Sequence, residues 1–257
     1  MSPVLFSVYT NELMCNNAIL TLIKFADDMA LVARLKDELS LANYFLYVDT
    51  MKSWFDTSFL ELNVRKTKEM CLMRGRKQNV SLCQSLNING EEVENVNVFK
   101  YLGTILDSNL SFTDNVDYIV KKAQQRFYLL RKLNSFNVSK DILTSVYRSL
   151  IESVMVFNIV SWYGNISVKN RTRLTRLVNM AGRVIGIKQK QLSELYSQSL
   201  QRKATQIFRD KSHPLHSRFQ ILHSGRRLKV PLAKKNCYKK SFIPSAISIL
   251  NTRLPHL

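Results

Sequence analysis

The chain has 257 residues, 46% hydrophobic and 22% charged, which is enough apolar material for one large domain or two smaller ones and excludes disorder throughout. Its 38 basic and 19 acidic residues give a formal net charge of +19, which favours a polyanion, nucleic acid first, as partner. A role at a membrane or in nuclear import is the alternative. With no apolar run of membrane-spanning length and no leader pattern, we expect an intracellular protein, cytoplasmic or nuclear, that is not secreted and has no membrane partner.

The positive charge is unevenly distributed along the sequence. Residues 1–120 hold 11 basic and 15 acidic residues, whereas residues 121–257 hold 27 basic and 4 acidic residues. The four cysteines, Cys15, Cys71, Cys83 and Cys237, are far apart and form no C-x-x-C pair, so we expect free buried thiols.

The first part of the chain has alternating helix and strand patterns. A helix is expected near the N-terminus, followed by two short strands, Leu20 to Ala26 and Met29 to Ala33, that meet at Asp27-Asp28. Helical spacing of apolar residues then predicts a helix from Asp37 or Ser40 to Phe59.

Three further features complete this region. A strand is predicted from Lys68 to Met73, and Asn89-Gly90 is a strong hairpin signal. The sequence VFKYLGTIL reads as a further strand with Gly103 inside it.

From about residue 112 the pattern is helical. Helices are predicted at 114–133, 139–163, 169–185 and 190–210, with Gly186 ending the third. The sequence after His213 is basic and rich in loop residues. The predicted domains are therefore residues 1–111, 112–212 and 213–257.

Two adjacent carboxylates at a hairpin turn are typical of a site for a shared cation. Asp27 and Asp28 would present oxygen atoms at the edge of a sheet, where Mg²⁺ takes one or two protein carboxylates and shares substrate phosphates. A solvated Asp-Asp turn is the alternative when the pair is taken alone.

The sequence around this pair resembles the reverse transcriptases of non-LTR, LINE-type retrotransposons. In that family a helix written roughly S-P-L-L-F-x-x-Y-x-N-D-L precedes an F-A-D-D hairpin. Here the corresponding residues are Ser2-Pro3-Val4-Leu5-Phe6, Tyr9, Asn11, Glu12 and Leu13, then Phe25-Ala26-Asp27-Asp28.

Two downstream blocks extend the resemblance to residue 106. The first is a helix ending in W-F, followed by L-x-L-N-x-x-K-T, and the second is F-K-Y-L-G-x-x-L. They are matched by Trp54-Phe55, Leu60, Leu62, Asn63, Lys66 and Thr67, and then by Phe99-Lys100-Tyr101-Leu102-Gly103 and Leu106.

The resemblance implies an α+β fold, a partial right-hand polymerase palm followed by an all-helical thumb. It implies that Asp27 and Asp28 are catalytic metal ligands, that Lys66 lies near the nucleotide phosphates, and that Phe99, Lys100, Tyr101, Leu102 and Gly103 support the primer. The intact family enzyme copies an RNA template from a DNA primer, with dNTPs and Mg²⁺. An exposed lysine in a basic loop remains an equal interpretation of Lys66.

The family's other metal-binding aspartate and its fingers lie upstream of the helix motif with which this sequence opens. We therefore expect the chain to be a fragment without polymerase activity of its own. The alternatives are a non-enzymatic nucleic-acid-binding module and a retrotransposon remnant, and no protein partner is predicted.

The helical half has two amphipathic segments with basic outer faces. Apolar residues gather on one side of each, Ile119, Ala123, Phe127 and Leu130 in the first and Leu174, Leu177, Val178 and Ala181 in the second. A basic face can follow a phosphate backbone, although a merely solvated face is the alternative. The predicted contacts with nucleic acid, in an RNA–DNA duplex or its separate strands, are Lys121, Lys122, Arg126, Arg131, Arg173, Arg176, Arg226 and Arg227.

Three other interpretations of this half are weaker. Residues 162–186 are similar to a helical segment at the N-terminus of one AlkB-type dioxygenase family, but the histidines form no H-x-D motif for an iron site. Trp162 and Tyr163 could stack on bases, although a buried aromatic pair is favoured. The spacing of the histidines and Cys237 fits no common zinc finger.

Overall fold

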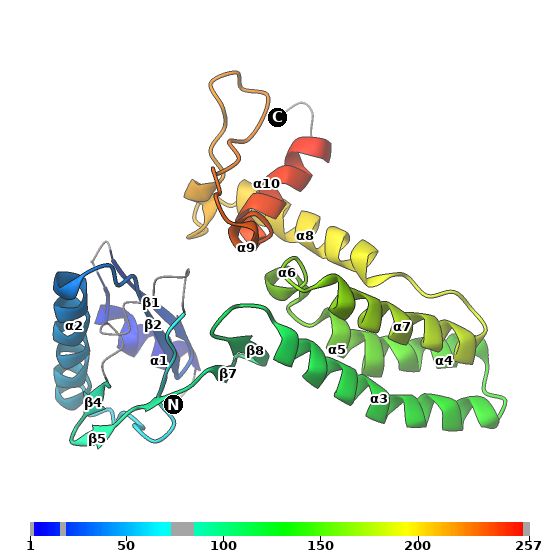
Figure 1. Ribbon diagram of the computed structural model, residues 1–257, viewed down its shortest axis with the longest axis horizontal. Helices are drawn as coiled ribbons and strands as arrows, with labels where there is room; N and C mark the ends of the chain where they lie inside the picture. The colour runs from blue at the N-terminus through cyan, green and yellow to red at the C-terminus, as the bar shows by residue number, and fades with distance from the viewer. Residues whose placement is uncertain (1–2, 16–18, 73–84, 254–257) are drawn as a thin grey trace. The chain divides into compact units, whose positions relative to one another are not determined.

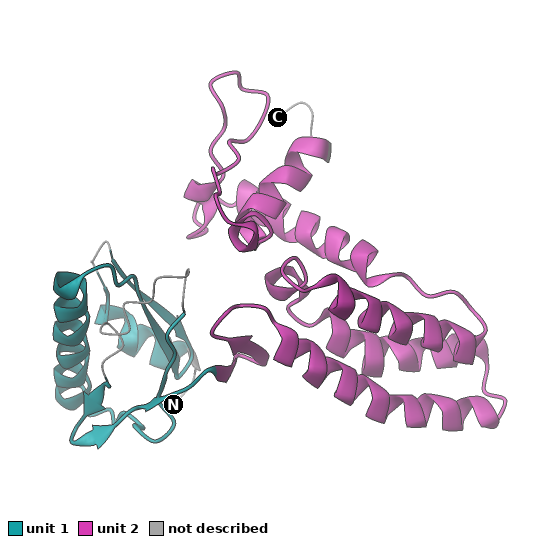
Figure 2. Ribbon diagram, viewed as in Figure 1, with its two compact units in different colours: residues 1–97 teal, residues 98–257 magenta. Residues whose placement is uncertain are grey.

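The computed structural model describes residues 3–15, 19–72 and 85–253. The chain divides into two compact units, residues 1–97 and residues 98–257 (Figure 2). Together they form a mixed α+β protein with small hairpins, as predicted. The division falls before the hairpin of residues 98–107, whereas the composition of the sequence changes after it. Predicted features at Ser2, Met73 and Cys83 lie outside the described residues.

The first unit begins with a short helix and a β-hairpin (Figure 1). Helix α1 (Pro3–Tyr9) leads through η1 (Thr10–Glu12) to the antiparallel strands β1 (Leu20–Phe25) and β2 (Asp28–Ala33). Phe25 pairs with Asp28, so the two-residue turn consists of Ala26 and Asp27. The prediction of a turn at Asp27-Asp28 was therefore wrong by one residue, because Asp28 already pairs with β1.

Helix α2 (Glu38–Thr57) contributes the buried apolar side chains of Leu41, Val48 and Phe55 to the first unit. The Asp37 carboxylate accepts a hydrogen bond from the Ser40 amide at 2.8 Å, and the Ser40 hydroxyl accepts one from the Asp37 amide at 3.0 Å, a capping box that fixes where α2 begins. Val48 packs with three buried residues from the following segment, Leu86, Ile88 and Val93.

Four very short strands complete the first unit. The hairpin predicted at Asn89-Gly90 is confirmed, and the strand predicted from residue 68 is reduced to two residues in a parallel pair. They are β3 (Lys68–Glu69), β4 (Asn87–Ile88), β5 (Glu91–Glu92) and β6 (Glu94–Asn95).

The second unit opens with the hairpin β7 (Val98–Tyr101) and β8 (Thr104–Asp107), whose turn is Leu102-Gly103. Both turn residues have positive φ, 44° and 83°, as a tight hairpin turn requires. The sequence predicted one strand through Gly103, and the chain instead reverses there. A Cβ on Gly103 would lie 2.9 Å from the Phe157 ring, so glycine also permits this close approach.

The Asp107 carboxylate connects the hairpin to helix α3 (Thr113–Ser135). It is buried and accepts hydrogen bonds from the backbone amides of Asn109, Ser111 and Phe112, at 3.1, 3.0 and 2.6 Å. These bonds satisfy amide groups beside the first turn of α3, where Phe112 has a left-handed φ of 56°.

The helix predicted at 139–163 is four connected pieces. They are α4 (Lys140–Val146), the π-helix η3 (Tyr147–Glu152), α5 (Ser153–Val156) and α6 (Ile159–Trp162). Buried residues recur every fourth position, at 143, 147, 151, 155 and 159. In a regular α-helix each such step rotates by about 40°, so the wider π-turn helps to keep these residues facing the core. Asn158, with φ of 48°, breaks the run.

By length and composition, the run from Lys140 to Trp162 could cross a membrane, with a mean hydropathy of 1.2. Core helices of soluble proteins share this property. Tyr147, Ile151, Met155 and Trp162 have 0% exposure and lie in the main core of the second unit, together with Phe127 and Leu174. One face of the run therefore lies in the core, and 28% of its apolar window is buried.

Helices α3 and α7 (Val168–Ile185) pack side by side in this core (Figure 1). The stripes predicted from the sequence are confirmed, since Ala123, Leu130, Leu174 and Ala181 are all fully buried. Each fully buried leucine contributes about 2 kcal/mol through removal of apolar surface from water. The predicted stop of α7 at Gly186, with φ of 77°, is also confirmed.

The last part of the chain folds against α8 (Leu192–Arg209). After η4 (His216–Arg218) come a loop, α9 (Asn236–Lys239) and α10 (Phe242–Arg253). Residues 213–257 were predicted to be loop-rich, so helix α10 was not predicted from the sequence. Leu200 and Ile207 of α8 pack against Ile247 and Leu250 of α10 in a second core.

Candidate nucleic-acid interface

The aspartate pair lies at the tip of hairpin β1–β2. Asp27 occupies the turn and Asp28 begins β2, and both side chains are exposed. Lys24, in β1, donates hydrogen bonds to the backbone oxygens of Thr10 and Leu13, at 2.7 and 3.0 Å. This lysine, which the sequence analysis did not select, fastens the end of the first helical segment to the hairpin that carries the pair.

Lys66 is exposed on a turn organised by Asn63. The Asn63 side-chain oxygen accepts the Lys66 amide at 3.1 Å, and the Asn63 carbonyl accepts the Thr67 amide at 3.0 Å. The Thr67 hydroxyl donates to the same carbonyl at 2.9 Å, so these bonds use the side chains of both Asn63 and Thr67. They position the backbone of Lys66, and its role toward a nucleotide stays a prediction.

Hairpin β7–β8, which carries Phe99 to Gly103, is fastened to the helices of the second unit. The Ile105 amide donates to the Asn115 side-chain oxygen at 3.1 Å, and the Asn158 side chain donates to the Thr104 hydroxyl at 3.1 Å. Phe99 and Tyr101 are half-buried, whereas Leu102 and Gly103 in the turn are exposed. The exposed turn therefore lies on a hairpin whose position is held by these two hydrogen bonds.

Seven of the eight predicted basic contacts fall into two groups. The side chains of Lys121 and Arg176, on α3 and α7, are exposed, as are those of Arg226 and Arg227. Three others are engaged within the protein. Arg126 donates to the Leu150 carbonyl, Arg131 contacts the Met180 sulfur at 3.2 Å, and Arg173 forms an ion pair with Asp117 at 2.6 Å.

The remaining lysine of the set, Lys122, belongs to a cluster around Tyr118. Its ammonium group lies 4.7 Å from the centre of the Tyr118 ring, and that of Lys100 lies 5.1 Å from the same centre. Lys100 also donates to the Tyr118 hydroxyl at 3.3 Å. The Lys122 ammonium, followed by Lys100, lowers the pKa of Tyr118. The sequence analysis selected both lysines and missed the tyrosine between them.

Arg226 and Arg227 lie on a short ribbon, residues 220–229. Ile221 and Leu228 form a bridge, and Leu222 donates to the carbonyl of Arg227 at 2.8 Å. The side chain of Asn251, in α10, accepts from the Leu228 amide at 2.8 Å and donates to its carbonyl at 2.9 Å. This pair of bonds fastens the ribbon to α10.

Several alternative sites are not supported. Trp162 and Tyr163 are 0% and 6% exposed, so the favoured interpretation of a buried pair is confirmed. Among the described residues no group of three His, Cys, Asp or Glu side chains could hold a metal ion. Cys15, Cys71 and Cys237 form no disulfide, and they are half-buried rather than buried as expected.

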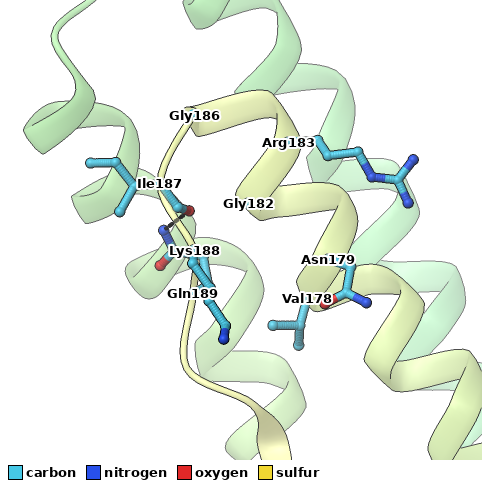
Figure 3. Close-up of a pocket in the computed structure, with 8 residues that line it drawn as sticks. All are labelled: Val178, Asn179, Gly182, Arg183, Gly186, Ile187, Lys188 and Gln189. Atoms are coloured by element: carbon cyan, nitrogen blue, oxygen red, sulfur yellow. Dashed lines mark hydrogen bonds between the residues drawn. The ribbon is translucent and has the colours of Figure 1, made fainter.

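A cavity of about 540 Å³ lies at the end of α7 (Figure 3). The loop after Gly186 folds back along the helix, and a Cβ on Gly182 would lie 3.3 Å from the Ile187 carbonyl. The Gln189 side chain donates to that carbonyl at 3.0 Å, while Arg183 extends away from the loop. The hollow is explained by this helix ending, and none of the predicted site residues lines it.

Two known protein families match parts of the chain. Residues 1–106 match the family described as "Reverse transcriptase (RNA-dependent DNA polymerase)", a stretch that includes Asp27, Asp28 and Lys66. Residues 112–153 match "Alkylated DNA repair protein alkB homolog 8, N-terminal". This second match covers α3, α4 and η3, upstream of residues 162–186 where a similarity of that kind was predicted.

Three relatives of the chain are RNA-directed DNA polymerases of mobile elements. The chain is 26% identical, over 72% of its length, to "Probable RNA-directed DNA polymerase from transposon BS" of Drosophila melanogaster. It is 21% identical to "RNA-directed DNA polymerase from mobile element jockey" of the same species, over 62% of its length, and of Drosophila funebris, over 69%. It therefore contains a reverse transcriptase domain sequence that is distantly homologous to these polymerases over part of its length.

The alignments cover 21%, 18% and 20% of these three relatives, so the chain spans about a fifth of their length. No solved structure matches the chain.

Proposed function

We propose that this chain is the portion of a non-LTR retrotransposon reverse transcriptase that ends the palm and forms the thumb. In this proposal the first unit is the palm end and the second unit grips an RNA–DNA duplex. The observation that carries the proposal is the exposed pair Asp27-Asp28 at the tip of a hairpin, inside the stretch that matches the reverse transcriptase family.

The aspartate pair fits part of a magnesium site. Mg²⁺ usually takes one or two protein carboxylates and completes its shell with water and substrate phosphates. Asp27 and Asp28 can supply that share, and within the described ranges no third ligand accompanies them. When bound, Mg²⁺ would polarise phosphate oxygens. The two carboxylates would hold and orient it, and Lys66 would lie beside the nucleotide.

The second unit has the charge that a duplex partner requires. Residues 98–257 contain 28 basic and 7 acidic residues, a net charge of +21, whereas residues 1–97 contain 10 and 12. Arg176 and Lys121 expose their charge on α7 and α3. Neutralised phosphates release counterions, so this surface favours an RNA–DNA duplex or its strands. We place the protein in the nucleus or cytoplasm, where such duplexes are made.

Binding of an RNA–DNA duplex by the whole chain tests this proposal. Fluorescence anisotropy at a series of salt concentrations should show affinity that falls steeply as salt rises. Arg176→Glu should weaken binding and lower the slope of log affinity against log salt by about 1, the loss of one phosphate contact.

Arg34→Glu is the matched control. It makes the same change in net charge at an exposed position of the first unit, which is not proposed to grip the duplex. An equal effect of both substitutions would mean that only overall charge matters, and binding insensitive to salt would refute the proposal.

A second candidate is a non-enzymatic nucleic-acid-binding module, which the concentration of positive charge in the second unit favours. The two candidates differ in whether duplex binding depends on Asp27 and Asp28. Duplex binding unaffected by Mg²⁺ and by Asp28→Asn would favour the module.

A further inference from the structure

The charged residues of the C-terminal tail, residues 211–257, are all basic. The tail contains 10 Lys and Arg residues and no Asp or Glu. In its described part, residues 211–253, no Lys or Arg side chain takes part in an ion pair. Like charges held close together repel one another, and a partner with acidic groups removes that repulsion. The tail is therefore suited to a negatively charged partner.

Within this tail, residues 230–235 form an exposed segment without helix or strand. The segment precedes α9 and belongs to the loop that projects beside α10 (Figure 1). Its residues 230, 232 and 234 are exposed, whereas residues 231 and 233 are half-buried. This alternation is typical of an extended chain, whose successive side chains point to opposite faces. One face of the segment therefore presents Val230, Leu232 and Lys234 in a row.

The backbone of the segment is unpaired over most of its length. Just before it, the Lys229 amide donates to the Gln220 carbonyl at 2.7 Å, and at its end the Lys235 carbonyl accepts from the Lys239 amide at 3.2 Å. Between these bonds, residues 230–234 form no hydrogen bond with any described part of the chain. An extended chain with unpaired amides and carbonyls is the form in which peptides bind in the grooves of other proteins.

The rest of the second unit anchors both ends of the segment. Leu228, which precedes it, is buried in the second core and bonded to Asn251 of α10. After α9, the Lys240 carbonyl oxygen lies so close to Gly164 that a Cβ on this glycine would be 2.2 Å away. Fixed ends limit the conformational freedom of the segment, so binding would cost less ordering entropy than for a flexible tail.

Exposed aliphatic side chains favour a protein over nucleic acid as the partner. The exposed fraction is 102% for Leu232, 50% for Val230 and 53% for Ile221 in the neighbouring ribbon. Phosphate groups bind the cations and leave a leucine without a contact, whereas a protein groove has pockets for alternate side chains. A lipid surface would accept a leucine, but the unpaired backbone groups beside it are strongly disfavoured in hydrocarbon.

We propose that residues 230–235 are a docking segment for a protein groove that has acidic side chains and binds an extended chain. Carboxylates of the groove would pair with Lys234 and Lys235, an apolar pocket would take Leu232, and polar groups would pair with the backbone. Receptors for nuclear import have this chemistry, because they recognise exposed segments rich in lysine and arginine. Such a receptor is the partner assigned here. The assignment goes beyond the proposed function and does not rest on it.

Binding of the whole chain to a purified nuclear import receptor tests this assignment. The readout is the fluorescence anisotropy of the labelled chain as receptor is added. We expect saturable binding that weakens as the salt concentration rises, because the lysines are exposed. A synthetic peptide of residues 226–240 should displace the chain from the receptor. Absence of saturable binding would overturn the assignment.

Two substitutions, each with a matched control, locate the contact. Lys235→Glu should weaken receptor binding by about tenfold or more, because it places a carboxylate against acidic side chains. Lys211→Glu makes the same charge change at an exposed position of the same tail and should leave the affinity unchanged. Leu232→Ser removes the exposed aliphatic group without a change in charge and should weaken binding by about fivefold. Val168→Ser, at an exposed position of α7, is its control.

Equal losses in Lys235→Glu and Lys211→Glu would overturn the assignment, because only the net charge of the tail would then matter. Unchanged receptor binding in Leu232→Ser would overturn it as well. An RNA–DNA duplex and vesicles of phosphatidylcholine and phosphatidylserine serve as rival partners. If Lys235→Glu weakened binding to either rival and not to the receptor, the segment would belong to nucleic acid or lipid instead. Failure of the proposed function looks different, because the chain would then bind the receptor and show no salt-dependent binding of a duplex.

Discussion

At the scale of single residues, the sequence predicted which side chains are buried better than it predicted which polar groups meet. Helical spacing identified Phe127 and Leu174 as core residues, because burial repeats with the period of the helix. Asn115 was missed although it lies four positions before buried Ile119. A polar residue in phase with an apolar stripe is the signal that would have revealed it. The meeting of Lys100 with Tyr118 depends on tertiary packing, which no local pattern encodes.

Tyr147 offers a test of the cost of a buried hydroxyl. Its side chain is 0% exposed, and its oxygen has no hydrogen-bond partner among the described residues. Burial raises the pKa of Tyr147, so the phenol is neutral in the folded and unfolded states at neutral pH. Tyr147→Phe should therefore stabilise the fold by about 1 kcal/mol, equally from pH 5 to 8, as measured by denaturant unfolding.

Tyr128→Phe on α3 is the control for this substitution. The Tyr128 side chain is 72% exposed, so removal of its hydroxyl should change stability by less than about 0.5 kcal/mol. Destabilisation by Tyr147→Phe would show that its hydroxyl has a partner in solution.

At the scale of elements, the sequence predicted most helices and hairpins and missed the interruptions. Helix α2 and hairpin β4–β5 were predicted because the helical spacing of apolar residues and the Asn-Gly pair are local signals. The break at Asn158 was missed because one of the two hydrogen bonds beside it joins residues that are distant in the sequence. The Asn158 side chain donates to Thr104, and the Trp162 indole donates to the Phe157 carbonyl at 3.0 Å. Helix α10 has few charges, and its position in a basic tail obscured its pattern.

The ribbon of residues 220–229 depends on one side chain of α10. Asn251→Ala removes both hydrogen bonds to Leu228 and leaves the amide and carbonyl of that residue unpaired in a site that is 1% exposed. Local stability of the ribbon should fall by about 1–3 kcal/mol. Hydrogen exchange of the Leu228 amide should rise accordingly, while the amides of α3 should keep their protection.

A second variant separates the two bonds. Asn251→Asp keeps an acceptor for the Leu228 amide and loses the donor to its carbonyl, so exchange should be intermediate. Unchanged exchange in Asn251→Ala would mean that the ribbon is held by other contacts.

At the scale of the whole molecule, the two compact units divide between residues 97 and 98, whereas charge and composition change near residue 112. Hairpin β7–β8 resembles the first unit in its strands, yet its contacts with Asn115 and Asn158 belong to the second unit. The amino-acid composition of the chain changes where strands give way to helices, whereas the division into compact units depends on which residues are in contact. The order of the reverse transcriptase motifs was recognisable because it is a property of the sequence alone.

The whole chain should bind a duplex without extending it. Its aspartate pair has no third carboxylate among the described residues, and two-metal phosphoryl transfer needs a complete set of ligands. Each 1.36 kcal/mol of lost transition-state stabilisation costs tenfold in rate. Template-directed incorporation of dNTPs with Mg²⁺ should therefore be undetectable. Incorporation that is abolished by Asp28→Asn would contradict this prediction.

The π-turn at Tyr147–Glu152 also has a consequence for comparison across species. A π-turn holds about one residue more than the α-helical turn it replaces. A homologous protein that covers the same core with a regular helix should therefore be one residue shorter there. We expect a single-residue gap at this turn when such proteins are aligned, and sequence positions on its two sides to differ in numbering by one while their side chains fill the same places.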